Sequence, residues 1–427
     1  MSELIYIKNF LVVDEAEIAV KKINVIIGPQ ANGKSVIAKL LYFFKNSSNA
    51  FLSGIRRSLP KRELDSGILE DFEKRFPRYS WEGTELHIRY LLDELFVEVR
   101  GVRSARGKTT LKLYYSSGLL NLYNARKRIY QRKLQEAREA NKKERGYSDD
   151  IHVFYEHVVD AIKSSDFNSF FSTSVFVPAS RTFFANLQKN IFTFLASNLD
   201  IDPFLKEFGS LYENSKYWYK DGFRGRFIQR DKNIIEEIDN LMEAVVDGEY
   251  EFANDQDWIA SKGKRVNLAN ASSGQQESLP MLLTLCVWPF IRSEEEGAMF
   301  FIEEPEAHLF PTSQGYIVSI ISLLHSSLGT SFFLTSHSPY ILSALNNFIL
   351  AADAVSQGRM TVDGFVKINK SGRPIKFEDV AAYTISDGVV SSINDEEFRM
   401  LGADMLDGIS DHFEAVMNKI IQCGDVG

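Results

Sequence analysis

The stretch GPQANGKS, from Gly28 to Ser35, constrains the fold more than any other part of this sequence. It matches the pattern GxxxxGK[ST] at every specified position. The apolar run INVII precedes it, and the run SVIAKLLYFFKN, apolar at helical spacing, follows it and is expected to end near Asn46 and two serines. A strand, a glycine-containing loop and a helix in this order are typical of a loop that holds nucleotide phosphates. The alternative is a chance match in a turn, and the flanking strand and helix weigh against it.

Each part of this loop has an expected task. The glycines allow backbone N–H groups to turn inward around the phosphates, and the helix N-terminus adds its partial positive charge. Lys34 is expected to reach the terminal phosphates, and the Ser35 hydroxyl to bind Mg²⁺. The loop alone therefore predicts Mg²⁺ and a nucleoside triphosphate, ATP or GTP, and the segments described below favour ATP. The predicted nucleotide-binding residues are Gly28, Pro29, Gln30, Ala31, Asn32, Gly33, Lys34, Ser35 and Val36.

The segment AMFFIEEPE predicts a second element of the phosphate site. Met299 to Ile302 is apolar and indicates a central parallel strand, with Glu303 and Glu304 at its carboxyl end, where ligands bind in open α/β sheets. We expect Glu303 to hold the water shell of Mg²⁺ and Glu304 to orient or deprotonate the attacking water. On its own the segment could equally be a buried strand that enters an acidic turn, but the loop at Gly28 favours the catalytic interpretation.

Two further segments complete the pattern. TSFFLTSHSPYIL indicates a strand that ends near His337, and we expect this strand to lie beside the Glu304 strand, so that His337 is able to hydrogen-bond a γ-phosphate or its attacking water. NASSGQQE describes an ordinary helix N-cap, but a helix that opens on Ser-Ser-Gly is also an anion site. Ser273, Gly274 and Gln275 are therefore candidate nucleotide contacts.

Composition excludes several classes of protein. The chain has 427 residues, of which 44% are apolar and 25% are charged, as in an ordinary soluble globular protein. The net charge of −8 argues against a protein that coats nucleic acid with its whole surface, although a local basic face remains compatible. Two cysteines in unlike settings, no signal sequence and no membrane-length apolar run predict a cytoplasmic protein with no membrane contact.

The remaining patterns predict an α/β fold with helical insertions. Strands are expected in 85–115, a long basic helix in 119–145, and helices in 185–247. GFVKIN and EDVAAYTI read as strand-like, and 396–421 as an amphipathic helix. We expect the following division: a lobe with the phosphate loop and antiparallel strands (1–116), a basic helical insertion (117–170), the VPASR strand with a helical subdomain (171–248), a segment with the SSGQQ, EEPE and TSH motifs (249–345), and a C-terminal strand and helix region for oligomer or partner contact (346–427).

In their order and spacing, these segments resemble an ABC-type ATPase head. Glu304 follows Gly274 by 30 positions, and His337 follows Glu304 by 33. More specifically, they resemble the RecF/SMC-like branch that includes the OLD (overcoming lysogenization defect) ATPases, whose EEPEAHLHP is similar to EEPEAHLFP here. The opening IKNFLVVDEAEIAV is similar to that branch's first two strands. The resemblance covers residues 3–46, 174–181 and 264–342, and it implies a mixed or parallel sheet core with an antiparallel β subdomain.

The resemblance also implies roles for individual residues. Lys34 with its loop is the Walker A motif, Glu304 the catalytic glutamate and His337 the switch histidine. Glu303 stands where most ABC heads have Asp, as this branch tolerates. Ser273 and Gly274 fit the signature motif, which in this family contacts the γ-phosphate of ATP held by the opposite subunit. A homo-oligomer is therefore expected, at least a head-to-head dimer, and higher assemblies are also compatible.

Three departures from the family pattern stand out. Gln275 replaces the second signature glycine, although SSGQQ is common in this branch. Phe310 occupies a typical histidine position, so we expect His308 to be structural. No glutamine lies between Gln30 and Gln131, where the Q-loop residue is usual, which leaves Ser180 and Arg181 of VPASR as candidates for that position.

Two functions remain open. OLD nucleases carry a C-terminal Toprim domain, but no DxD pair follows Leu342, and no HNH pattern is present. The chain therefore resembles the ATPase subunits of PARIS-type or Septu-type anti-phage defence systems. A separately encoded Toprim- or HNH-type effector nuclease is then the expected partner, and DNA or a phage protein is the expected trigger.

The alternative function is a RecF-like repair ATPase that clamps DNA, which the basic helix from Arg126 to Arg145 favours. We favour the alternative that this helix is a solvated protrusion or a short hairpin that packs against a sister subunit, because neighbouring glutamates dilute its charge. A transporter subunit is disfavoured, because EEPEAHL is not that branch's Walker B.

Overall fold

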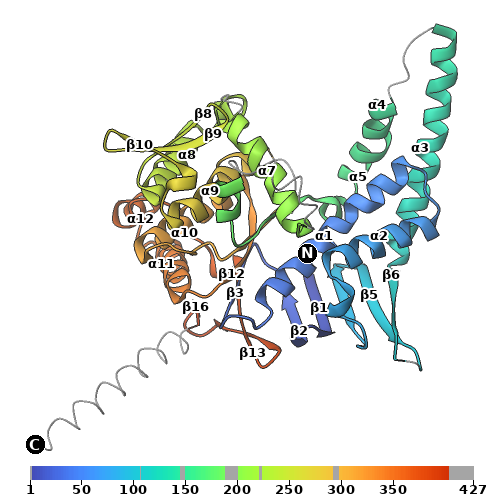
Figure 1. Ribbon diagram of the computed structural model, residues 1–427, viewed down its shortest axis with the longest axis horizontal. Coiled ribbons are helices and arrows are strands. Elements are labelled where there is room, and N and C mark those ends of the chain that lie inside the picture. The colour runs from blue at the N-terminus through green and yellow to red at the C-terminus, as the bar shows by residue number, and fades with distance from the viewer. Residues whose placement is uncertain are drawn as a thin grey trace, which may run out of the picture.

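The computed structural model describes residues 2–105, 107–144, 150–187, 201–220, 224–291 and 298–402. One eleven-stranded mixed sheet runs through the molecule (Figure 1). Five strands at one end pair antiparallel, in the order β6 (Thr109–Tyr115), β5 (Leu95–Arg103), β4 (His87–Leu92), β1 (Glu3–Phe10) and β2 (Val13–Ala19). At the other end β3 (Ile23–Ile27), β12 (Ser331–Ser336), β11 (Met299–Glu303) and β7 (Ser174–Val177) pair parallel. The expected mixed sheet, with a parallel core and an antiparallel part, is confirmed.

A C-terminal hairpin joins the two parts of the sheet. Its strands β13 (Val380–Ser386) and β14 (Val389–Ser392) lie between β3 and β2, and β13 runs parallel to β3. The two strands of the sheet that come last in the sequence, β13 and β14, therefore lie between two of its first strands, β2 and β3. Most of EDVAAYTI forms β13, as expected.

Burial patterns explain why each segment takes its place. In β4 buried and partly exposed residues alternate, as in a sheet with one face on the core. In β3, β11 and β12 every residue is buried, because helices cover both faces of the parallel part. Alternate residues of each parallel strand enter opposite cores, with Phe300 on one side and Phe301 on the other.

One face of the sheet carries α1 (Lys34–Arg56), α2 (Lys61–Arg75) and α3 (Ser117–Glu144), and the other carries α8 (Arg224–Val246), α9 (Ser273–Ile291), α10 (Pro311–Leu328) and α11 (Pro339–Ser356). The remaining described elements are short or peripheral. They are α4 (Asp150–Phe154), η2 (Tyr155–Val159), α5 (Asp160–Lys163), α7 (Pro203–Lys220), α12 (Val362–Asn369), the 3₁₀ turns Arg78–Ser80, Asn168–Phe171, Leu268–Asn270 and Phe377–Asp379, the three-stranded sheet β8 (Glu249–Ala253), β9 (Gln256–Ser261) and β10 (Lys264–Asn267), and the pair β15 (Asn394–Asp395) and β16 (Met400–Leu401). Within the described residues, no helix has the length and hydropathy needed to cross a membrane.

The basic segment forms an arm. Helix α3 leaves the sheet and packs against α4, through the rings of Tyr130 and Phe154 at 5.5 Å and an ion pair between Arg138 and Asp150 at 2.8 Å (Figure 1). This helical hairpin has the form of the protrusion considered above.

Three expected boundaries were wrong. Helix α1 does not end near Asn46 but continues to Arg56, because the Ser47 and Ser48 hydroxyls donate to the carbonyls three residues earlier and are buried without breaking the helix. GFVKIN is not a strand but lies in α12, whose first turn is capped by the Thr361 side chain.

The third boundary concerns the C-terminal segment. A helix was expected from Glu396, but the chain there turns into β16, and Leu401 bonds through its backbone to Asn346 of α11. The rest of that expected helix lies outside the described residues, as do parts of the segment 185–247.

An aromatic layer holds α1, the helix that follows the phosphate loop, on the sheet. Tyr42 of α1 contacts Phe176 of β7 and Phe301 of β11, with ring centroids 5.2 and 5.6 Å apart. We predict that Phe301→Ala lowers the free energy of unfolding by about 3–5 kcal/mol, because it leaves a cavity under α1. Urea denaturation measures this. Phe301→Leu serves as the control, and an equal loss in both variants would contradict a packing origin.

Candidate ATP site

The phosphate loop lies between β3 and α1, as its pattern predicts. Gly28 and Gly33 have φ values of 156° and 95°, and Gly33 is the residue that precedes the first turn of α1. A Cβ at Gly33 would lie 2.8 Å from a methyl of Val13, so the β1–β2 turn leaves no space for a side chain there. The backbone of Gly28–Gly33 and the first residues of α1, Lys34, Ser35 and Val36, therefore form one compact cradle at the carboxyl edge of the sheet.

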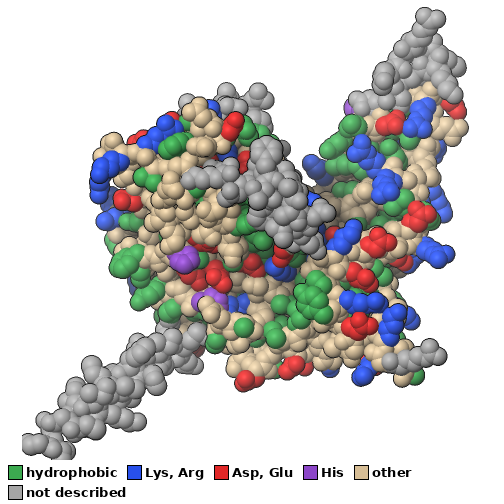
Figure 2. Space-filling view, in the orientation of Figure 1, with side chains coloured by type: hydrophobic (Ala, Val, Ile, Leu, Met, Phe, Trp, Pro, Cys, Tyr) green, Lys and Arg blue, Asp and Glu red, His purple; other side chains and the backbone are tan. Residues whose placement is uncertain are grey.

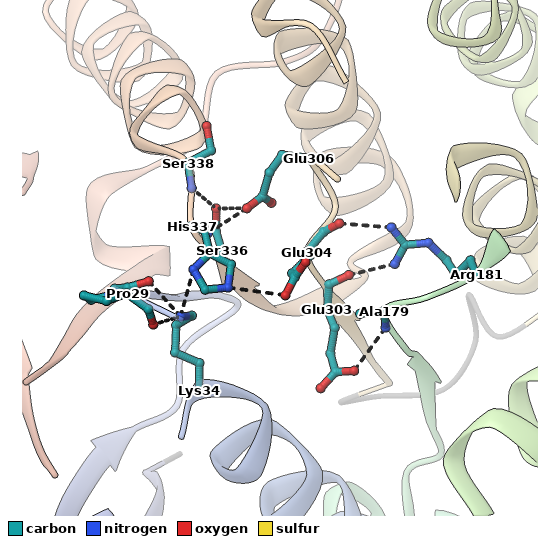
Figure 3. Close-up of polar contacts among 11 residues, drawn as sticks. Pro29, Lys34, Ala179, Arg181, Glu303, Glu304, Glu306, Ser336, His337 and Ser338 are labelled. Atoms are coloured by element: carbon teal, nitrogen blue, oxygen red, sulfur yellow. Dashed lines mark hydrogen bonds and ion pairs between the residues drawn. The ribbon is translucent and has the colours of Figure 1, made fainter. Parts of the chain in front are cut away.

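The structure brings three of the predicted site residues together in a chain of contacts. The Lys34 ammonium donates to the carbonyls of Gly28 at 2.7 Å and Pro29 at 2.6 Å and lies 3.2 Å from His337 Nδ1 (Figure 3). His337 Nε2 in turn lies 3.3 Å from Glu304 Oε1. Burial lowers the pKa of Lys34, and the Glu304 and Glu306 carboxylates oppose that shift.

Glu304 stands in an unusual backbone conformation. Its φ is 45°, a region that a non-glycine residue seldom adopts, and its N–H donates to the Thr335 carbonyl of β12 at 2.9 Å. Strained positions of this kind persist where surrounding contacts hold them, and they gather at functional sites. The strain places the Glu304 side chain at the end of β11, partly exposed and facing His337 (Figure 3).

Glu303 is suited to a metal ion. It is only 4% exposed, its Oε2 accepts from the Ala179 N–H at 3.1 Å, and its other oxygen, Oε1, has no partner. Burial raises its pKa, while the charge of Lys39, the Ala179 N–H and the nearby Ser35 side chain oppose that shift. A buried carboxylate oxygen without a partner, beside a serine hydroxyl, fits the oxygen-only preference of Mg²⁺.

Glu306 is a functional residue that the sequence interpretation missed. Its buried Oε1 accepts from the Ser336 hydroxyl at 2.8 Å and from the His337 backbone N–H at 2.6 Å. It therefore fixes the end of β12 and the backbone of His337. The glutamate in EEPE was the available signal, but nothing local connected it with a residue 31 positions later.

Arg181 lies behind the two carboxylates. Its side chain is fully buried, and its guanidinium donates to the carbonyls of Glu303 at 2.7 Å and Glu304 at 3.0 Å (Figure 3). VPASR does end the neighbouring strand β7, but Arg181 contacts the backbone of β11. Of the two Q-loop candidates, Ser180 has a φ of 61° in the turn between Ala179 and Arg181.

Ser273 and Gly274 open helix α9, and Ser272 caps it. The Ser272 N–H donates to Gln275 Oε1 at 3.1 Å and the Gln275 N–H to Ser272 Oγ at 3.3 Å, a reciprocal capping box. The Gln275 side chain also donates to the Val246 carbonyl. These bonds run within α9 and toward α8, and Ser273 is exposed at the helix N-terminus.

Gly274 has a steric reason to be glycine. A Cβ there would lie 2.8 Å from the His308 carbonyl oxygen. His308 has a φ of 59° and an exposed side chain, and its backbone packs against α9, whereas Phe310 is 74% exposed. The contact of His308 with α9 is made by its backbone, in accord with the structural role expected for it.

A loop of phosphate-binding pattern after β3, Glu303 and Glu304 at the end of β11 and a histidine after the intervening strand β12 form the arrangement expected of a P-loop ATPase. The chain matches the family AAA_15, described as an AAA ATPase domain, over residues 1–174 and 186–342. It belongs to this family of ATPase domains.

Three similar solved structures illustrate the comparison. An SMC head bound to the C-winged helix domain of ScpA is 13% identical, with a TM-score of 0.41 and coverage of 93% of this chain and 98% of that one. The SMC head domain from Thermotoga maritima is 12% identical, with a TM-score of 0.36 and coverage of 92% and 99%. The recombination mediator RecF is 11% identical, with a TM-score of 0.31 and coverage of 92% and 98%. No curated protein matches the chain.

The burial of Glu303 yields a prediction about stability. Because its pKa is raised in the folded protein, ionisation of Glu303 opposes folding once the pH exceeds its ordinary value. Glu303→Gln removes this cost and keeps an oxygen acceptor for Ala179. We expect a higher melting temperature at neutral pH without nucleotide and Mg²⁺. The gain should disappear at about pH 3, below the usual carboxyl pKa of about 4.3. Calorimetry at both pH values tests this, and an unchanged or lower melting temperature at neutral pH would contradict it.

Proposed function

We propose that this chain binds and hydrolyses ATP as the ATPase subunit of a bacterial anti-phage defence complex. ATP would draw two heads together, and the closed oligomer would hold or activate a separately encoded Toprim- or HNH-type nuclease. The observation that carries the ATPase part is the contact chain from Lys34 through His337 to Glu304, built at the edge where the phosphate loop lies. The defence role rests on the resemblance of the motifs to stand-alone ATPases of that branch.

The geometry supports a proposed task for each group. Lys34, now on the loop carbonyls, would transfer its hydrogen bonds to the terminal phosphates of ATP. Glu303 and Ser35 would hold Mg²⁺, which supplies charge neutralisation at the phosphates. Glu304 would take a proton from the attacking water, and His337 would orient that water or hydrogen-bond the γ-phosphate.

The signature residues favour a site that two chains complete. Ser273 is exposed at the start of α9, and the helix dipole at an N-terminus of this kind attracts an anion. Within this chain the cap residues bond to one another and to Val246, not to the loop at Gly28. A γ-phosphate held by a second head would provide the missing anion.

Two substitutions test the ATPase assignment. Lys34→Ala should abolish ATP binding, because it removes the cation for the terminal phosphates. Glu304→Gln should bind ATP but hydrolyse it about 10²- to 10⁴-fold more slowly, because the general base is lost. Calorimetric binding and phosphate release measure both effects. Lys61→Ala is the matched control, since Lys61 begins α2 as Lys34 begins α1.

The same variant tests head association. With ATP and Mg²⁺, Glu304→Gln should accumulate as a stable oligomer in light scattering. Wild-type turnover in this variant would refute the role of Glu304, and a monomer at saturating ATP would refute the closed pair. A nuclease subunit that co-purifies with the trapped form would support the defence role, and an isolated replication or repair partner would count against it.

A second function, a RecF-like ATPase that clamps DNA, is favoured by one specific surface. Lys112, Arg100, His87 and Lys8 stand directly opposite one another across β6, β5, β4 and β1. Like charges directly opposite one another are unfavourable in a sheet. Among the described residues, the carboxylates beside this row are Glu98, which is buried and bonded to Arg100, and Glu15, which stands opposite Lys8 on β2. A phosphate backbone would neutralise this row.

Charge reversal decides between the two functions. If the chain clamps DNA, Lys8→Glu with Lys112→Glu should weaken binding to plain duplex DNA and reduce the salt dependence by about two phosphate contacts. Lys262→Glu with Lys264→Glu, in the exposed β9–β10 turn, is the control for net charge. DNA binding that is absent in the wild type, or unaffected by the first pair, would remove the DNA-clamp function from consideration.

A further inference from the structure

The most heavily bonded buried side chain beside the ATP site is Arg181. Its side chain is 0% exposed, and it fills a position between three segments distant in sequence. Nε donates to the Glu277 carbonyl at 2.8 Å, and one terminal nitrogen donates to the carbonyls of Pro178 at 2.8 Å and Glu303 at 2.7 Å. The other donates to the Glu304 carbonyl at 3.0 Å. Its hydrogen bonds thus go to backbone oxygens of the chain itself, so it is not a nucleotide ligand.

Glu277 completes the arrangement from the side of helix α9. It lies one turn after Ser273 and is 3% exposed. Its two carboxylate oxygens accept from the backbone N–H groups of Arg181 and Thr182, each at 2.9 Å. The turn after β7 is therefore clamped to α9 by a carboxylate and to the end of β11 by a guanidinium.

The same turn also reaches the metal-binding side chain. Ala179, two residues before Arg181, donates its N–H to Glu303 Oε2. The 178–182 turn thus touches the carboxylate of Glu303, the peptide groups of Glu303 and Glu304, and the first turns of α9. Because Glu304 holds a strained φ, the donors on its carbonyl determine where its side chain points.

A buried ion pair of this kind is a weak source of stability, because desolvation offsets much of the attraction. Its geometric effect is stronger, since the planar guanidinium fixes several acceptors at once. The Arg181–Glu277 pair therefore restricts motion of α9 relative to the Walker B strand, so that neither shifts without the other.

We propose that Arg181 and Glu277 are positioning residues that couple the signature helix α9 to the two Walker B carboxylates of the same chain. This rests on the proposed function, in which α9 contacts the γ-phosphate bound by a second head. Engagement of α9 at one nucleotide would then set Glu303 and Glu304 for hydrolysis at the other nucleotide. Neither residue touches ATP, and both act through the peptide groups at the end of β11.

The test separates affinity from turnover in the full-length chain. Glu277→Gln retains the shape of the side chain but loses one acceptor and the charge. We expect its dissociation constant for ATP to stay near that of the wild type, while kcat falls about 10- to 100-fold, the usual cost of removing an outer-shell partner. Arg181→Lys should behave in the same way, because an ammonium cannot bond all these carbonyls together. Wild-type kcat in Glu277→Gln, or a loss of affinity that matches the loss of kcat, would overturn the proposal.

A second buried pair controls for destabilisation. Lys216 and Asp257 form an ion pair at 3.2 Å with side chains 2% and 0% exposed, and they lie on α7 and β9. Asp257→Asn should lower the melting temperature but leave kcat per folded protein unchanged. If kcat fell as much in Asp257→Asn as in Glu277→Gln, the loss in Glu277→Gln would be explained by general destabilisation of the fold. That result would refute a positioning role.

A double-mutant cycle tests the coupling itself. Ser273→Glu opposes approach of a phosphate to α9, because its carboxylate repels the phosphate charge. If Arg181 and Glu277 transmit that contact, Ser273→Glu combined with Glu277→Gln should be no slower than Ser273→Glu alone. Additive losses would overturn the coupling. If Ser273→Glu alone keeps full turnover, the composite site of the proposed function fails, and the affinity and kcat of Glu277→Gln still report on positioning within one chain.

Discussion

The parallel pairing of β3, β12 and β11 is the constraint on which the rest of the site depends. The register sets Ile27 beside Ser336 and Thr335 beside Glu303, so three strands end at the same edge within one residue of each other. The loop that begins at Gly28, the side chain of His337 and the carboxylates of Glu303 and Glu304 then emerge together from segments that span most of the chain. The apolar strands hold this register because both faces are buried, and a slip by one residue would exchange the two cores.

Motifs whose conformation depends only on neighbouring residues could be predicted from the sequence. The loop at Gly28 needs only its neighbouring strand and helix, and the strand before Glu303 ends where its apolar run ends. The serines at positions 272 and 273 also predicted the start of a helix from the local sequence alone. His337 required one further assumption, that its strand lies beside the Glu304 strand, and the parallel pairing of β11 and β12 confirms it.

Residues whose roles depend on distant partners could not be predicted. Arg181 is bonded to Glu277, which lies 96 positions away, and no local pattern decides whether such an arginine faces a nucleotide or the back of a strand. Glu306 depends on Ser336 in the same way. GFVKIN has the composition of a strand, but it is helical in the structure. Phe365 packs against Phe348, with ring centroids 5.2 Å apart, and the Thr361 side chain caps the helix. This packing and this cap together override the strand propensity.

Two cationic side chains at the site, Arg181 and Lys34, differ in how firmly their partners hold them. Arg181 is enclosed, and its bonds to fixed carbonyls give it one arrangement only. Lys34 instead donates to the carbonyls of Gly28 and Pro29 and contacts His337. Phosphate oxygens would replace these partners with stronger hydrogen bonds, because donor and acceptor would then both be charged. Entry of a phosphate would therefore draw Lys34 away from His337 and leave the imidazole with Glu304 and the backbone anchor at Glu306. Nucleotide binding would free the histidine at the point where hydrolysis needs it, while the arginine keeps the carboxylates in place.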